Sequence, residues 1–143
     1  MSTTLIAKKT IKINAPAAKV WEALTTPKII KQYFYDTDVQ TTWEVGSPIV
    51  FRGEWDGEEY EDKGVIKDFD PEKRLNYTYW SSMSGKEDIP ENYCTIRYDL
   101  YFKDGKTELL ITQDNIKDKA EKERCEQNWA QVQQRLKELL EKQ

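Results

Sequence analysis

The segment from Asp118 to Gln143 constrains the fold most, because it predicts one long amphipathic helix. Its apolar residues recur at steps of three and four and therefore share one helix face. They are Cys125, Trp129, Val132, Leu136, Leu139 and Leu140. Asp118 and Glu121 have the spacing of a capping box, which satisfies free N–H groups of the first turn. A single helix with a broad apolar face needs a sheet to lie across.

The residues before this helix predict that sheet. Leu5–Ile13 alternates in polarity from Lys8 onward, as a strand does. Two short helices should follow, one beginning at Pro16 and one running from Pro27 to about Tyr33, with Thr26 as the cap of the second. Turn dipeptides such as Asp56-Gly57 and Asp104-Gly105 then separate further strands. These strands are Val39–Trp43, Ile49–Trp55, Glu59–Phe69, Leu75–Trp80, Tyr93–Phe102 and Thr107–Thr112. Helices and strands are segregated along the chain, which indicates an α+β fold.

Size and charge narrow the class of protein. A chain of 143 residues is expected to form one domain. A net charge of −4 argues against nucleic-acid binding, and no apolar run is long enough for membrane insertion. The N-terminus lacks the order of a signal peptide, so we expect a cytoplasmic protein. Cys94 and Cys125 fit a reducing compartment, and we expect two free, largely buried thiols at the same end of the domain.

The chain contains no histidine, and this absence limits its chemistry. It removes the usual general base and the commonest transition-metal ligand. Among the carboxylates, Glu58, Glu59, Glu61 and Asp62 cluster near a hairpin tip, where such runs are expected to be solvated. The sequence therefore predicts no catalytic residue, no metal site and no cofactor. An enzyme on this scaffold would have to shape its substrate, with tyrosines as weak acids.

Three segments resemble a known family. Ile13–Pro27 (INAPAAKVWEALTTP) is similar to the opening signature of the Aha1-like branch (activator of Hsp90 ATPase homologue 1-like) of the START/Bet v 1-like (SRPBCC) superfamily. Gly64-Val65-Ile66 leading to Asp70-Pro71 agrees with it, as does the terminal helix from Asn128 to Glu141. The resemblance covers nearly the whole chain. It implies a helix-grip fold: a curved antiparallel sheet of about six to seven strands wrapped around a long C-terminal helix, with a cavity between them and two short helices after the first strand.

Alternation along the strands predicts which side chains face that cavity. Tyrosine is the commonest ring among them, and buried hydroxyls need partners, which favours a partly hydrated pocket; a packed core is the alternative. The candidate ligand-binding residues are Phe51, Tyr77, Tyr79, Tyr98, Gln113, Trp129, Val132 and Leu136. Gln113 stands where relatives of this branch often carry a histidine. Its amide can orient a ligand but cannot act as a base near pH 7, and it could instead bond to the backbone at the strand end.

Three tryptophans with polar neighbours, Trp43, Trp55 and Trp80, are candidate anchors for a protein partner; scattered surface aromatics without function are the alternative. The resemblance makes an Hsp90-type chaperone the named candidate for such a partner. The chain lacks the Asn-x-Trp-x-Trp-x-Glu motif with which eukaryotic co-chaperones act on the ATPase, so binding is expected rather than stimulation. Three hypotheses remain: non-enzymatic binding of a small hydrophobic or aromatic molecule, which we favour; chaperone binding; and an aromatase/cyclase-like enzyme.

Overall fold

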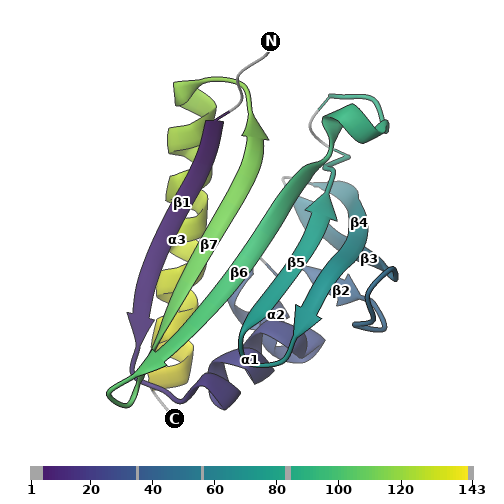
Figure 1. Ribbon diagram of the computed structural model, residues 1–143. Helices are drawn as coiled ribbons and strands as arrows, with labels where there is room; N and C mark the ends of the chain where they lie inside the picture. Colours follow the sequence, from purple (N-terminus) through teal and green to yellow (C-terminus); the bar gives the residue numbers. More distant parts are fainter. Residues whose placement is uncertain (1–4, 35, 56, 83–84, 142–143) are drawn as a thin grey trace.

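The computed structural model describes residues 5–34, 36–55, 57–82 and 85–141, which form an antiparallel sheet of seven strands with three α-helices (Figure 1). The strands are β1 (Leu5–Ile13), β2 (Asp38–Gln40), β3 (Pro48–Trp55), β4 (Glu58–Asp70), β5 (Arg74–Tyr79), β6 (Cys94–Lys103) and β7 (Lys106–Ile116). The helices are α1 (Ala17–Thr25), α2 (Pro27–Tyr33) and α3 (Lys119–Glu141), with a short 3₁₀ helix, η1 (Pro90–Asn92), before β6. No helix within these ranges is both long and apolar enough to cross a membrane.

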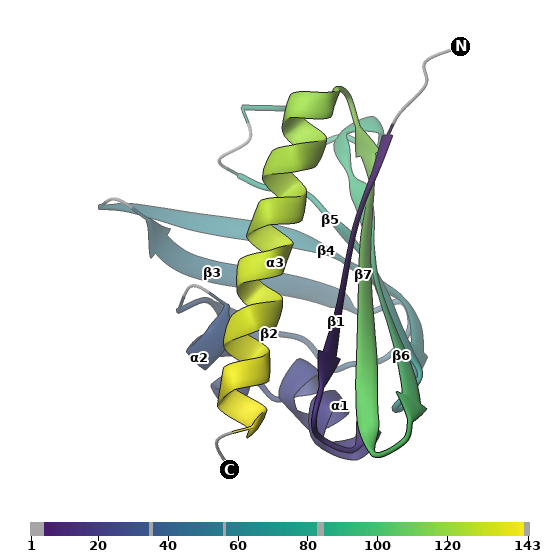
Figure 2. The same cartoon turned by 90° about the vertical axis from the view of Figure 1, so that its left-hand side faces the viewer.

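The sheet order is β1-β7-β6-β5-β4-β3-β2, and neighbouring strands are antiparallel. Figure 2 shows β1 and β7 running along α3, whereas β3 and β4 cross behind it, so the sheet curves around the helix. This arrangement confirms the predicted helix-grip α+β fold, including the two short helices after the first strand.

The predicted helix caps differ in outcome. At α3, the backbone N–H of Glu121 donates to the Asp118 carboxylate at 2.9 Å, as the capping-box spacing predicted. At α2, Thr26 occupies the cap position but its side chain makes no capping hydrogen bond. The predicted cap position is therefore correct, but the expected side-chain hydrogen bond is not formed. Pro27 at the first position lacks an N–H, which leaves one fewer donor to satisfy there.

A buried glutamine ties α3 to the sheet. Gln133 is 1% exposed, and its side-chain nitrogen donates to the backbone oxygens of Lys9 in β1 at 3.0 Å and of Leu109 in β7 at 3.1 Å. Further along α3, the Lys137 ammonium donates to the backbone oxygen of Lys12 at 2.8 Å. The Gln133 amide can be buried because it is hydrogen-bonded. Together with the Lys137 bond, its two bonds hold α3 along β1 and β7 at the edge of the sheet.

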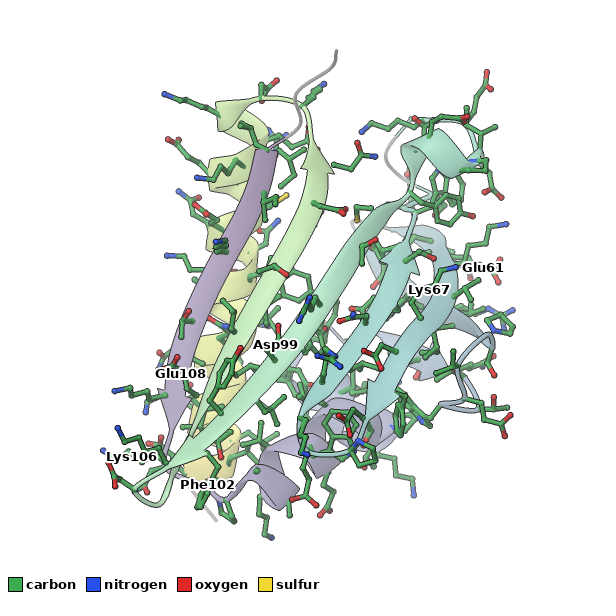
Figure 3. All side chains as sticks on the ribbon, viewed as in Figure 1. Glu61, Lys67, Asp99, Phe102, Lys106 and Glu108 are labelled. Carbon is green, nitrogen blue, oxygen red and sulfur yellow. The ribbon has the colours of Figure 1, made fainter. Side chains whose placement is uncertain are left out.

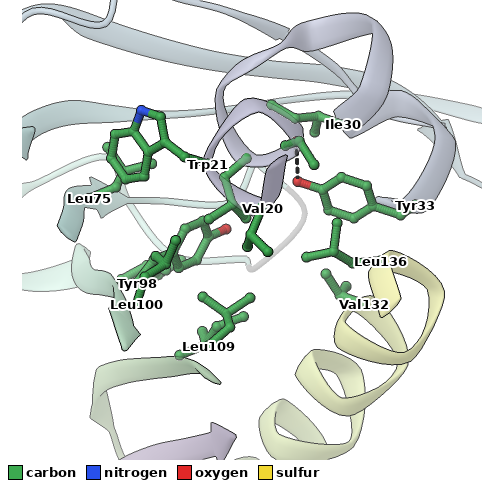
Figure 4. Packing of buried hydrophobic residues seen from close by; sticks show 14 of the residues in the cluster. Val20, Trp21, Ile30, Tyr33, Leu75, Tyr98, Leu100, Leu109, Val132 and Leu136 are labelled. Atoms are coloured by element: carbon green, nitrogen blue, oxygen red, sulfur yellow. Dashed lines mark hydrogen bonds between the residues drawn. The ribbon is translucent and has the colours of Figure 1, made fainter. Parts of the chain in front are cut away.

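The interior is densely packed at the end where α1, α2 and the C-terminal part of α3 meet. Figure 4 shows Val20, Tyr33 and Leu136 together in this region, all of them buried. The Tyr33 hydroxyl donates to the backbone oxygen of Ala23 at 2.9 Å, which satisfies its polar tip. Opposite this core, the outer face of the sheet carries charged side chains such as Lys67, Asp99 and Glu108 (Figure 3). The sheet therefore has one apolar and one polar face, as alternating strands require.

Candidate ligand-binding cavity

Beyond the packed end, the space between the sheet and α3 contains a cavity of about 440 Å³. Its wall comes from β4 to β7, from α3 between Cys125 and Val132, and from the chain that follows α2. The lining residues are Phe34, Thr37, Tyr60, Asp62, Tyr77, Tyr79, Ile96, Gln113, Cys125, Asn128, Trp129, Gln131 and Val132. Its volume lies within the range of small-molecule sites, and its composition, mostly apolar and aromatic with a few polar groups, is typical of them.

A network of aromatic rings forms one side of the cavity. The ring of Trp129 meets those of Phe34 and Tyr98 edge-on, with centroid distances of 5.8 and 6.0 Å. Tyr98 in turn meets Tyr77 at 5.8 Å, and the two hydroxyls hydrogen-bond at 3.0 Å. Edge-to-face contacts are the favoured geometry for such rings. Burial raises the pKa of Tyr98 to about 12 and that of Tyr77 well above its usual value, so both phenols are protonated near neutral pH.

Gln113 is joined to Trp129 across the cavity wall. The indole nitrogen of Trp129 donates to the side-chain oxygen of Gln113 at 2.9 Å. The amide nitrogen of Gln113 makes no hydrogen bond to another described residue, and Gln113 lines the cavity. Because a primary amide carries two N–H donors, Gln113 offers a neutral donor to a ligand. Among the described residues, the Gln113 side chain hydrogen-bonds to Trp129 and to no backbone group, which differs from the alternative of a backbone bond at the strand end.

Asp62 corrects the expectation that the carboxylates near the hairpin tip are solvated. Glu58, Glu59 and Glu61 are exposed, but Asp62 is only 6% exposed and lines the cavity. Its carboxylate accepts hydrogen bonds from the Tyr79 hydroxyl, from the Ser82 backbone N–H at 3.0 Å and from the Ser82 hydroxyl at 3.4 Å. The reason is strand parity: Asp62 shares the inner face of β4 with the fully buried Ile66 four residues later.

Tyr60 also faces inward, two residues before Asp62 in β4, and it lies over its cross-strand partner Gly53 in β3. A Cβ atom at Gly53 would come within 2.4 Å of the Tyr60 hydroxyl, so the glycine leaves room for this ring. The hydroxyl hydrogen-bonds to that of Thr37 at 2.6 Å, which links β4 to the chain after α2. Phe34, Thr37, Tyr60 and Asp62 line the cavity but were not among the predicted site residues.

Of the predicted ligand-binding residues, Tyr77, Tyr79, Gln113, Trp129 and Val132 line the cavity. Phe51 and Tyr98 lie behind its wall. The Phe51 ring is 5.5 Å from those of both Tyr77 and Tyr79, so it supports the lining rings. Leu136 is fully buried in the packed end, one helical turn beyond Val132.

Of the three predicted partner-binding tryptophans, the structure describes the side chains of two, Trp43 and Trp80, and these two have different neighbours. Trp43 is half-buried and packs on Phe69, with ring centroids 6.3 Å apart. Trp80 is half-buried and stacks beside Tyr93, with ring centroids 6.4 Å apart. The Lys63 ammonium lies 5.8 Å from the centroid of the Trp80 ring. Trp55 ends β3, but its side chain lies outside the described residues.

Both cysteines are free, as predicted. Cys94 is 9% exposed, and burial raises its pKa to about 12. Cys125 is half-buried rather than largely buried, because it lies on α3 where the helix borders the cavity. Burial also raises the pKa of the Cys125 thiol. Both are therefore protonated near neutral pH, and neither resembles an activated nucleophile. Among the residues that the structure describes, no cluster of three or more potential metal ligands occurs.

Comparison with known proteins supports the same architecture. The profile of a family described as "Activator of Hsp90 ATPase homolog 1-like protein" matches residues 14–141. The solved structure of ChR145 from Cytophaga hutchinsonii is 43% identical, covers 96% of this chain and 94% of its own, and superposes with a TM-score of 0.85. No curated protein sequence matches the chain.

Two more distant structures share the fold. The Aha1 dimer from Colwellia psychrerythraea is 20% identical, with 93% of each chain covered and a TM-score of 0.73. Ara h 8.0201 is 11% identical, with 99% of this chain and 100% of that chain covered and a TM-score of 0.78. At these identities the likeness concerns the fold, which many functions can share.

Proposed function

This chain belongs to the Aha1-like family of the START/Bet v 1-like superfamily, and from that premise we propose that it binds a small hydrophobic or aromatic molecule without transforming it. The observation that carries the proposal is the cavity of about 440 Å³ between the sheet and α3. The aromatic and aliphatic lining residues supply apolar contact area, and the polar groups, among them Gln113 and Asp62, give the ligand an orientation.

The protonation state of the tyrosines that line the cavity favours ligand binding over catalytic turnover. Burial raises the pKa of Tyr77 and Tyr79 well above the usual value for tyrosine, so neither phenol ionises near neutral pH. General-base catalysis works best with a group whose pKa lies near the working pH. The chain has no histidine to fill that role.

Binding of a neutral apolar dye tests the proposal, because its affinity depends on the apolar cavity and not on a charge of the ligand. Nile red should bind with increased fluorescence and a saturable isotherm, since transfer of apolar surface out of water is favourable. Val132→Phe adds a ring at a buried cavity-lining position and should weaken binding about tenfold. Leu139→Phe is the matched control, because Leu139 is on the same helix but outside the cavity lining. Unchanged dye binding by Val132→Phe, with the fold intact, would contradict the proposal.

Chaperone binding is the second candidate, supported by the description of the matching family. Trp80 is its candidate contact, since the ring is half-exposed and buried aromatic anchors dominate many interfaces. Calorimetric titration with a purified Hsp90-type chaperone would show binding that Trp80→Ala weakens and Val132→Phe leaves intact. Absence of heat with the unmodified chain would remove this candidate.

A further inference from the structure

We infer, on the basis of the proposed function, that the cavity prefers an aromatic ligand that carries a protonated amine over neutral or anionic ligands. Asp62 is the only charged side chain among the described residues that line the cavity. In the described part of the chain, no lysine or arginine forms a salt bridge with it. The cavity therefore holds one negative charge that no lysine or arginine among the described residues pairs.

The donors to Asp62 satisfy it only in part. They are the Tyr79 hydroxyl on Oδ2, and the backbone N–H and hydroxyl of Ser82 on Oδ1. All of these donors are neutral, and a carboxylate has about four acceptor sites on its two oxygens. One acceptor site on Oδ2 therefore stays available. Burial, and after it the negative charge of Asp62, raises the pKa of Tyr79 well above its usual value, so this phenol stays a neutral donor to the carboxylate.

Buried charges in proteins are usually paired, because the loss of hydration is costly for a lone ion. An ammonium group on the ligand would supply the missing partner and form a charge-assisted hydrogen bond. A carboxylate on the ligand would meet like charge instead. The electrostatics of the cavity therefore discriminate by the sign of the ligand's charge.

The aromatic lining acts in the same direction. Ring faces carry negative quadrupole density and attract cations. Tyr79 holds the carboxylate directly, and Tyr60 lies two residues from Asp62 on the same face of β4. A cationic head near Asp62 would thus be surrounded by ring surface, while its aromatic body occupies the space toward Trp129. Gln113 adds only a neutral donor there, which does not offset the charge.

Three probes with one ring system test this preference by calorimetry at pH 7 and fixed salt. Tryptamine carries an ammonium group, tryptophol a hydroxyl and indole-3-propionate a carboxylate. Tryptamine should bind about tenfold or more tightly than tryptophol, because hydrogen bonds to charged groups are stronger than neutral ones. Indole-3-propionate should bind more weakly than tryptophol. If tryptophol or the acid binds as tightly as tryptamine, the inference is overturned while the proposed function stands.

Asp62→Asn should abolish the preference, so that tryptamine and tryptophol bind with similar affinity. Glu61→Gln is the matched control: it removes the same charge one residue away, from an exposed side chain paired with Arg52 on the outer face. It should leave the preference intact. A tryptamine preference that survives Asp62→Asn would overturn the inference. Should none of the three probes bind, the inference falls, and Nile red then decides whether the proposed function falls with it.

Discussion

The indole N–H of Trp129 and the side-chain oxygen of Gln113 are hydrogen-bonded at 2.9 Å, joining the middle of α3 to β7. Trp129 is 7% exposed and also contacts the rings of Phe34 and Tyr98. Trp129 thus contributes both to the network of aromatic rings and to the attachment of α3 to the sheet. The cavity wall is consequently part of the fold's stabilising core, so binding and stability are linked at this position.

Trp129→Ala should lower the free energy of unfolding by about 3 kcal/mol, the lower end for a buried aromatic, because the ring already borders empty space. Equilibrium urea unfolding measures this change. Gln127→Ala, at an exposed position two residues earlier, should change it by less than about 0.5 kcal/mol. A loss below about 1 kcal/mol for Trp129→Ala would show that the ring is not packed as described.

Two glycines on neighbouring strands should respond very differently to alanine. A Cβ at Gly64 would lie 1.6 Å from the backbone oxygen of Thr78, so the strands must separate, whereas a Cβ at Gly53 meets the movable end of Tyr60. Gly64→Ala should cost about 3 kcal/mol or more of unfolding free energy. Gly53→Ala should cost about 1 kcal/mol, through the lost Tyr60–Thr37 hydrogen bond. Equal losses in denaturant unfolding would contradict this difference.

Stability should be flat between pH 6 and 8 and fall at alkaline pH. The chain has no histidine to titrate in the lower range. The pKa of Cys94 and Tyr98 is raised to about 12 by burial, so the native state keeps protons that the unfolded chain loses from about pH 9 upward. Because the unfolded state then binds fewer protons, the unfolding free energy decreases as pH rises, by roughly 3 kcal/mol between pH 8 and 10.5.

Urea unfolding at each pH measures this decrease. Tyr98→Phe removes one buried phenol and should make the decrease shallower. Tyr101→Phe, at an exposed position on the same strand, should leave the decrease in unfolding free energy unchanged. A stability that stays constant up to pH 10.5 would show that these groups are not buried.

The two thiols should react slowly in the native protein at pH 8 and rapidly after unfolding, because burial raises the pKa of both. Cys125 should react before Cys94, since it is half-buried and borders the cavity. Titration with a chromogenic disulfide reagent, with Cys125→Ala to assign the phases, measures this order. Immediate native reaction of Cys94 would contradict its burial.

The order of elements was predictable because strand alternation, proline positions and turn dipeptides are local signals. The inward set Tyr77, Tyr79 and Gln113 followed from the same parity. Asp62 was missed because a run of charges was treated as one solvated unit, although counting back in twos from Ile66 places Asp62 on the inner face. Phe34 and Thr37 lie between elements, where no periodicity indicates which side chains turn inward. The depth of burial depends on sheet curvature, which no local pattern encodes.

The central claim, that the cavity between the sheet and α3 binds a small aromatic molecule, is tested most directly at the indole N–H of Trp129. Titration with neutral tryptophol, followed in ¹H–¹⁵N correlation spectra, reports on each tryptophan side chain separately, with signals assigned by Trp→Phe variants. We predict a saturable shift of the Trp129 signal, while that of Trp80, which packs beside Tyr93 and does not line the cavity, stays in place. A Trp129 signal that does not move up to the solubility limit of tryptophol, or a saturable shift confined to Trp80, would contradict the claim.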